Sequence, residues 1–189
     1  MTKEFFEAFP TLLALHSTNE IRQQELKGVI PTLVDKRVNY VLKHYGIAEK
    51  VGRAFGINPI VILAQGAIES GWGTSNLATN YNNFFGITAY GTPNFYWKGG
   101  KYISTSSSLP FRTYDSTIDS FSDFARLLVS KYSTAAKASK NVSEYASLIS
   151  SSPYINEKNG DNRAKYKQLI IQNAILISTI TKKVQSLYN

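Results

Sequence analysis

Apolar residues recur along most of this chain at the three- and four-residue spacing of helices. Residues 33–55 carry the pattern and predict a helix, interrupted near Gly46. It returns from residue 116, where Asp115 or Ser116 is expected to cap the helix, and Asp119 and Asp123 are expected on its polar side. Further helices are predicted near residues 3–16, 19–30, 142–150 and 163–187. The pattern therefore predicts a mostly helical protein.

The most apolar of these helices is expected at the centre of the core. Asn58 and Pro59 form a helix start, with Asn as the N-cap and Pro at the first helical position. Consecutive apolar residues at 61–63 make the helix apolar on all sides, which is typical of a buried helix. It is expected to run to about Ser70 and to end at Gly71 and Gly73.

Residues 75–112 have a different character. Asn, Gly, Thr, Ser and Tyr dominate there, and helical periodicity is lost. Residues 96–102 predict a β-hairpin with a Gly-Gly turn. We therefore expect a mainly α (α+β) fold, closest to a lysozyme-like helical domain with a small β-hairpin lobe and a cleft between the lobes. One domain is expected over 1–189, with a helical extension at 1–32, an α lobe at 33–74 and 113–189, and a β lobe at 75–112.

Composition narrows the classes of function. The 189 residues include 43% hydrophobic and 18% charged residues, as expected of a folded globular protein. There is no Cys, which excludes disulfides, thiolate metal sites and Cys nucleophiles. Only His16 and His44 are present and they lack zinc-ligand spacing, so no metal and no cofactor is expected.

Charge points to the kind of partner. The net charge of +8 favours a polyanionic partner, which could be nucleic acid, an anionic membrane or a bacterial envelope, although a simple surplus of Lys explains it equally well. The basic residues are scattered and form no nucleic-acid motif, so nucleic acid is not expected as a partner. No stretch is long and apolar enough to cross a bilayer, and the first residues do not form a signal peptide.

Glu69 is the residue with the clearest chemical interpretation. It is the lone acid near the end of the apolar helix, and desolvating a carboxylate is costly, so its pKa is expected to be raised. A carboxyl group that stays protonated near neutral pH can serve as a general acid, as cleavage of a glycosidic bond requires. The alternative is a structural acid that ties the β lobe to the helix.

Four blocks resemble a known family. Residues 64–73 (AQGAIESGWG) resemble the catalytic segment of the bacterial glucosaminidases of glycoside hydrolase family seventy-three, which includes autolysins, flagellar-assembly peptidoglycan hydrolases and phage lysins. Residues 82–87 (NNFFGI) resemble the second block of that family, and residues 111–116 (FRTYDS) resemble its third. Pro153 and Tyr154 resemble its late Tyr motif. The resemblance covers roughly residues 36–180, with the blocks in the family's order.

The resemblance implies hydrolysis of the peptidoglycan glycan at N-acetylglucosamine. It places Glu69 at the general acid, and Tyr81, Asn83 and Tyr154 along the sugar cleft. Trp97 is a further candidate for stacking on a sugar, with packing of the hairpin as the alternative.

The chain departs from the family at the second acid. Many members carry a second Glu in the β lobe, whereas residues 70–114 of this chain contain no Asp or Glu. Asp115 and Asp161 are the candidates for that group, although Asp115 also fits an N-cap and Asp161 a polar loop. Otherwise the 2-acetamido oxygen of the substrate, or a water held by hydroxyl groups, attacks instead. We favour these last two options, which leave Glu69 as the only essential protein carboxylate.

Three interpretations of function remain at this stage. The leading one is a peptidoglycan glucosaminidase, with a muramidase or lytic transglycosylase on the same fold as the close alternative. A wall-binding or virion structural module is the alternative from another class. The lack of a signal peptide, anchor and wall-binding repeats favours a phage lysin or virion-associated hydrolase, released at lysis or carried in a virion, with peptidoglycan and other virion proteins as its partners.

Overall fold

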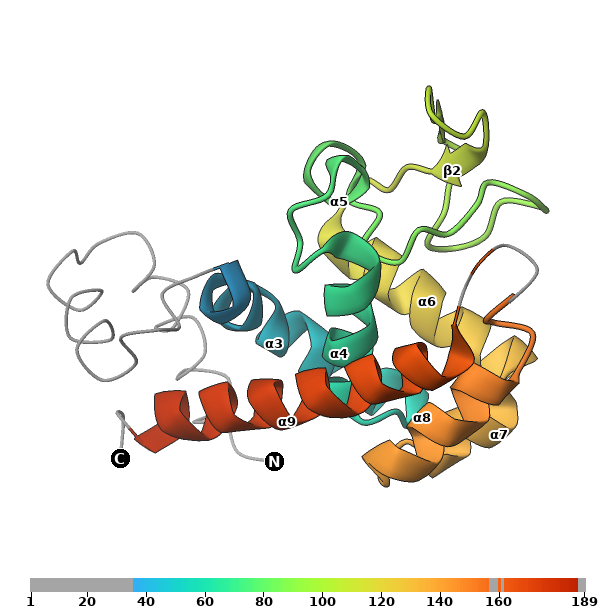
Figure 1. The fold of residues 1–189 in the computed structure, drawn as a ribbon. Coiled ribbons are helices and arrows are strands. Elements are labelled where there is room, and N and C mark those ends of the chain that lie inside the picture. The colour runs from blue at the N-terminus through green and yellow to red at the C-terminus, as the bar shows by residue number, and fades with distance from the viewer. Residues whose placement is uncertain (1–35, 157–159, 161, 187–189) are drawn as a thin grey trace, which may run out of the picture.

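The computed structural model describes residues 36–156, 160 and 162–186 (Figure 1). Seven helices and two strands are found in these ranges: α3 (Lys36–Phe55), α4 (Pro59–Ser70), α5 (Asn76–Tyr81), β1 (Lys101–Ile103), β2 (Pro110–Arg112), α6 (Thr117–Lys131), α7 (Ser133–Ala138), α8 (Val142–Ser151) and α9 (Arg163–Ser186). The extension expected at 1–32 and the helices expected at 3–16 and 19–30 lie outside the described residues.

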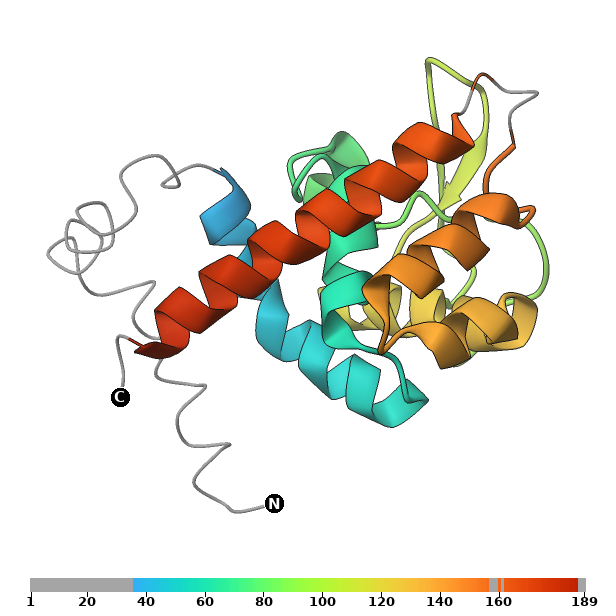
Figure 2. The same cartoon turned by 60° about the horizontal axis from the view of Figure 1, so that its bottom comes forward.

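Helix α4 is the centre of the α lobe. The Asn58 side chain accepts a hydrogen bond from the backbone N–H of Ile60 at 2.9 Å, and Gly71 ends the helix with a φ of 58°. Every residue from 61 to 67 is buried, because α3 and α9 pack against the helix. The long helix α9 crosses over α4 (Figure 2). This position of α4 confirms that its all-round apolar sequence marks a buried helix.

The β lobe gathers beside the C-terminal end of α4, together with α5 (Figure 1). Strands β1 and β2 pair antiparallel, with Tyr102 opposite Phe111. The hairpin expected at 96–102 is therefore wrong, because the turn falls in the Ser-rich segment 104–109. The Asn94 side chain instead accepts hydrogen bonds from the N–H groups of Tyr96 and Trp97, at 2.8 Å and 3.0 Å, and closes a compact loop ahead of β1.

Two further expectations need correction. Helix α3 continues through Gly46 without a break, because residues on both sides of the glycine pack into the same core. Short helix α5 lies within the stretch where helical periodicity is lost. It forms because Ser75 caps its start and Asn82 adopts the left-handed conformation at its end.

Asp123 joins the β lobe to α6 and was wrongly expected on the solvated side of that helix. Its side chain is 0% exposed. Its carboxylate accepts hydrogen bonds from Arg112 at 2.5 Å, Arg126 at 2.8 Å, Tyr114 at 2.9 Å and Asn94 at 3.0 Å. Burial opposes ionisation, but these bonds and the Arg112 charge together hold the pKa of Asp123 below its usual value. A buried ion-pair cluster therefore fixes the orientation of the β lobe.

His44 is buried among aromatic rings and predicts a pH dependence of stability. It is 3% exposed, and its Nδ1 has no hydrogen-bond partner within the described part of the chain. Burial, followed by the charge of Lys43, lowers the pKa of His44 to about 3. Between about pH 6.5 and pH 3 the unfolded chain binds this proton and the folded chain does not. The folded state therefore has its full stability, as far as His44 is concerned, above pH 6.5. Below that pH the free energy of unfolding falls, towards pH 3, by about 1.4 kcal/mol per pH unit.

The check is urea unfolding of the wild type and of His44→Phe between pH 7 and pH 4. We expect the free energy of unfolding of the wild type to fall more steeply with decreasing pH than that of the variant. Equal slopes for the two proteins would contradict a neutral buried imidazole.

Candidate active site

Glu69 lies half-buried in the last turn of α4, at the end of the helix that meets the β lobe. The hydroxyl of Tyr166, from α9, donates a hydrogen bond of 2.6 Å to Glu69 Oε1. A carboxyl at the C-terminal end of a helix also meets the negative end of the helix dipole, which disfavours its charge. One oxygen of Glu69 is thus held by a phenol while the side chain remains partly accessible.

A second layer of polar groups holds Tyr166. Gln65 lies one turn before Glu69 on α4, and its Nε2 donates to the Tyr166 hydroxyl oxygen at 3.0 Å. Tyr145, on α8, donates in turn to Gln65 Oε1. Gln65 and Tyr145 are both 0% exposed. These side chains therefore form a dry hydrogen-bond chain that ends on Glu69.

The tyrosines beside Glu69 stay protonated. Burial, then the neighbouring charges of Tyr154 and Glu69, raise the pKa of Tyr166 well above its ordinary value. Burial and the Glu69 charge raise the pKa of Tyr154 in the same direction. Both hydroxyls thus remain hydrogen-bond donors at any pH where a protein of this kind works.

Two of the predicted sugar-binding residues keep partly exposed rings. Tyr154 lies with its ring centroid 6.1 Å from that of Tyr166 and 5.5 Å from that of Tyr132. Tyr81 stacks on Tyr102 at 4.3 Å, which joins the end of α5 to β1. Tyr154 is therefore brought next to the Glu69 site, while Tyr81 remains a candidate on the β-lobe side.

Two other predicted sugar contacts are corrected by their burial. The Trp97 ring is 1% exposed, its Nε1 donates to Gly100 O at 2.8 Å, and the Arg112 guanidinium lies 4.1 Å over its centroid. Asn83 is also 1% exposed, and its side chain bonds the backbone of Ile87 and Arg112. Neither side chain has a free face or polar atom for a sugar, so both stabilise the β lobe instead.

Among the residues that the structure describes, the hydrogen bonds and ion pairs of the other carboxylates give the second acid no counterpart beside Glu69. Asp115 is exposed and directly precedes the Ser116 cap of α6, and Asp161 lies outside the described residues. Among the other described carboxylates, Glu49 pairs with Arg53 at 3.7 Å, and the four partners of Asp123 occupy its oxygens. Asp119 accepts from Ser116 at 2.6 Å, and Glu144 is exposed in the first turn of α8. None of these contacts brings a second carboxylate to Glu69.

The sequence interpretation missed Tyr166, Gln65 and Tyr145. Tyr166 is 97 positions from Glu69 in the chain, so no local pattern links them. The available signal was Gln65 itself, a polar side chain in an otherwise apolar buried run. Such a group requires partners, because a buried amide without hydrogen bonds is costly.

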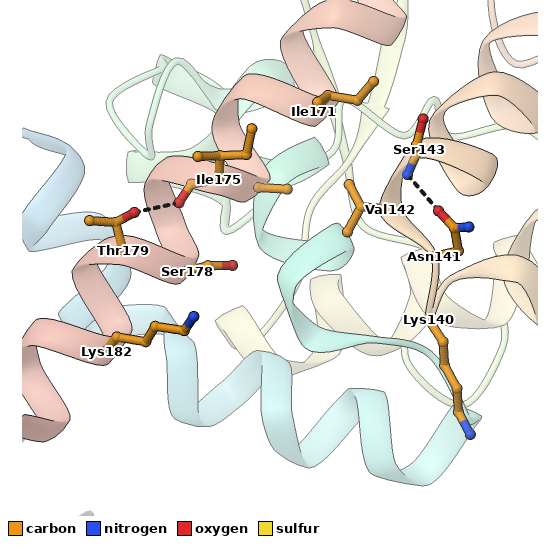
Figure 3. Close-up of a pocket in the computed structure, with 10 residues that line it drawn as sticks. Lys140, Asn141, Val142, Ser143, Ile171, Ile175, Ser178, Thr179 and Lys182 are labelled. Carbon is orange, nitrogen blue, oxygen red and sulfur yellow. Dashed lines mark hydrogen bonds between the residues drawn. The ribbon is translucent and has the colours of Figure 1, made fainter.

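A separate cavity lies away from Glu69, between the start of α8 and the C-terminal half of α9 (Figure 3). It has a volume of ≈ 630 Å³. Its lining residues are Lys140, Asn141, Val142, Ser143, Ile171, Ala174, Ile175, Ser178, Thr179 and Lys182. None of these has a side chain suited to general acid catalysis in glycoside hydrolysis, so the cavity is not the candidate active site.

The part of the chain that the structure describes contains neither a candidate metal site nor a candidate membrane-spanning helix. No group of three His, Asp or Glu side chains is arranged to hold a metal ion in these ranges. None of the helices described is long and apolar enough to cross a membrane.

Comparison with known proteins bears on this site. The family model described as "Glucosaminidase: Mannosyl-glycoprotein endo-beta-N-acetylglucosaminidase" matches residues 45–177. The peptidoglycan hydrolase FlgJ of Vibrio cholerae is 31% identical over 118 residues, which cover 56% of this chain and 34% of that protein. A probable N-acetylmuramidase of Lactococcus lactis is 30% identical over 119 residues, covering 60% of this chain and 27% of that protein. The chain thus matches only about a third of the length of these relatives.

Solved structures agree on the fold. The glycoside hydrolase domain of Salmonella typhimurium FlgJ superposes with a TM-score of 0.63 at 23% identity, covering 82% of this chain and 96% of that domain. The catalytic domain of the Listeria monocytogenes autolysin Auto gives a TM-score of 0.58 at 20% identity, covering 85% and 98%. The predicted fold class, a mainly helical lysozyme-like domain with a small hairpin, is confirmed. The predicted family is confirmed as well: the chain belongs to the glucosaminidases, the glycoside hydrolases of family seventy-three.

Proposed function

We propose that this chain is an endo-acting N-acetylglucosaminidase of peptidoglycan with Glu69 as its general acid. The observation that carries the proposal is the hydrogen bond of 2.6 Å from Tyr166 to Glu69 Oε1, at the lobe-facing end of α4. It orients a partly accessible carboxyl group inside a domain of a glycosidase family. The net charge of +8 suits an anionic wall as substrate.

Glu69 protonates the oxygen of the leaving sugar as the glycosidic bond breaks. Tyr166 donates to Oε1, and this bond orients the carboxyl group for the proton transfer. Tyr154, and Tyr81 stacked on Tyr102, offer partly exposed rings on which sugars can stack.

The attack on the sugar carbon does not use a second protein carboxylate in this proposal. The 2-acetamido oxygen of N-acetylglucosamine, or a water held by hydroxyl groups, attacks the oxocarbenium-like centre. The absence of Asp and Glu from residues 70–114 supports this assignment.

A muramidase is the second candidate, favoured by the Lactococcus lactis relative named a probable N-acetylmuramidase. A lytic transglycosylase would use the same acid. Carriage in a phage lysin or virion, with other virion proteins as partners, remains a prediction from the sequence, and the relatives reported above are bacterial proteins.

Product analysis tests the proposal. Purified peptidoglycan is digested, reduced with borohydride and analysed by mass spectrometry. Reduced N-acetylglucosamine ends are expected. Reduced muramic acid ends would mean a muramidase, and anhydro ends a transglycosylase. Sacculi that bind the folded protein but release no fragments would overturn the proposal in favour of a wall-binding or structural module.

A further inference from the structure

The hydrogen-bond chain behind Glu69 has a fixed direction. Tyr145 has a single proton on its hydroxyl and gives it to Gln65 Oε1. The Gln65 amide must then present its N–H groups to its other neighbour, Tyr166. The Tyr166 oxygen accepts that bond, so its own proton is free for Glu69 Oε1. Each step determines the next.

Burial makes this direction costly to change. Gln65 and Tyr145 are 0% exposed and Tyr166 is 9% exposed, so water cannot replace a lost partner. The three residues come from α4, α8 and α9, and α9 packs against both other helices. In this chain Tyr166 is the residue that contacts the carboxyl group, and three hydrogen bonds separate Tyr145 from that group.

We propose that Tyr145 and Gln65 are positioning residues that direct the Tyr166 proton to Glu69 Oε1 and so orient the catalytic carboxyl group. The inference rests on the proposed function, because it assigns the orientation of the acid in that reaction. Without the Tyr145 hydroxyl, the Gln65 carbonyl loses its donor and turns to accept from Tyr166. The Tyr166 proton is then drawn away from Glu69.

The consequence is measurable in the pH profile. A hydrogen bond donated to a carboxylate favours its ionised form, so losing that bond makes the acid harder to ionise. A general acid works only while protonated, and its ionisation sets the alkaline limb of the profile. Tyr166 from α9 and Tyr154 from the loop after α8 are titratable groups that act on Glu69. Neither ionises in the range of that limb.

The test compares Tyr145→Phe with Tyr40→Phe as a matched control. The Tyr40 hydroxyl is also buried against α4, where it donates to Leu63 O at 3.2 Å, but it is not part of the chain to Glu69. We expect Tyr145→Phe to lower kcat about fivefold, the value of one net hydrogen bond, with KM unchanged. Its alkaline limb should move to higher pH, and that of Tyr40→Phe should stay at the wild-type position.

A double variant separates positioning from packing. Tyr145→Phe should add little to the loss in Tyr166→Phe, because both changes remove the same interaction with Glu69. Independent, additive losses with an unmoved limb would overturn the inference and leave Tyr145 as a packing residue.

A second measurement follows the ionisation of Glu69 directly and does not depend on enzymatic turnover, which an unstable variant could lose for other reasons. The ¹³C resonance of the Glu69 carboxyl carbon should titrate at higher pH in Tyr145→Phe, and also in Gln65→Met, which has a side chain of similar length but no amide. If the Glu69 carboxyl carbon of a folded variant titrated at the same pH as in the wild type, the positioning role of the hydrogen-bond chain would be refuted. If the wild type releases no fragments from peptidoglycan, the proposed function fails by itself, whatever this titration shows.

Discussion

Glu69→Gln is expected to abolish release of peptidoglycan fragments while leaving the fold and wall binding intact. The amide keeps an oxygen that accepts from Tyr166, so the hydrogen-bond chain to Tyr145 survives. It has no acidic proton to give to the leaving oxygen. General acid catalysis contributes about 10²–10⁴-fold to rates, so kcat should fall by that factor or more with little change in KM. Initial rates on soluble glycan fragments measure the loss.

The matched control is Asp115→Asn. Asp115 is exposed and lies ahead of the α6 cap, so its variant should retain near wild-type turnover. If folded Asp115→Asn lost activity as completely as Glu69→Gln, two carboxylates would be essential, and the single-acid mechanism would be wrong. Asp161→Asn extends the same comparison to the other candidate named from the sequence.

The sequence predicted the parts of this fold that depend on local signals. Helix α4 was correct because its Asn58 cap, its apolar run and its Gly71 stop all lie within a short segment. Helices α8 and α9 followed from periodicity in the same way. Glu69 could be named as the candidate acid because it is the lone carboxyl group of that run and the run resembles the catalytic segment of the family.

The β lobe was harder to predict, because its contacts are not local. Trp97 and Asn83 have the residue types of sugar-binding groups, yet the lobe uses them to bond its own backbone. The sequence predicted a turn at Gly99 and Gly100, but the turn between β1 and β2 lies at residues 104–109. Tyr166 reaches Glu69 only because α9 crosses α4, and no spacing in the sequence encodes that crossing.

Asp123 was also hard to predict, and its removal is expected to cause a large loss of stability. Residues 120–125 are all buried, so this part of α6 has no solvated face, contrary to what helical periodicity indicated. Asp123→Ala would leave Arg112, which is 7% exposed, as a buried charge without its carboxylate. Breaking one partner of such a pair costs about 3–5 kcal/mol, so we expect a loss of stability of that size in urea unfolding.

Asp119→Ala is the control on the same helix. Asp119 belongs to the partly exposed cap of α6, where Ser116 bonds both its carboxylate and its backbone N–H. Ser116 still caps the helix in that variant, so the loss should be about 1 kcal/mol or less. Equal losses in the two variants would mean that Asp123 contributes no more than an ordinary surface acid.

The part of the structure that Asp123→Ala destabilises gives a sharper test than the size of the stability loss. Arg112 also donates to the carbonyls of Thr88 and Tyr90, at 3.1 Å and 3.0 Å, so the carboxylate holds the guanidinium that joins these strands and loops. Amide hydrogen exchange should therefore accelerate first in residues 87–112, while α4 and α9 stay protected. Uniform acceleration over both lobes would show that the cluster stabilises the whole domain. Acceleration confined to the β lobe would show that Asp123 holds that lobe in place beside Glu69.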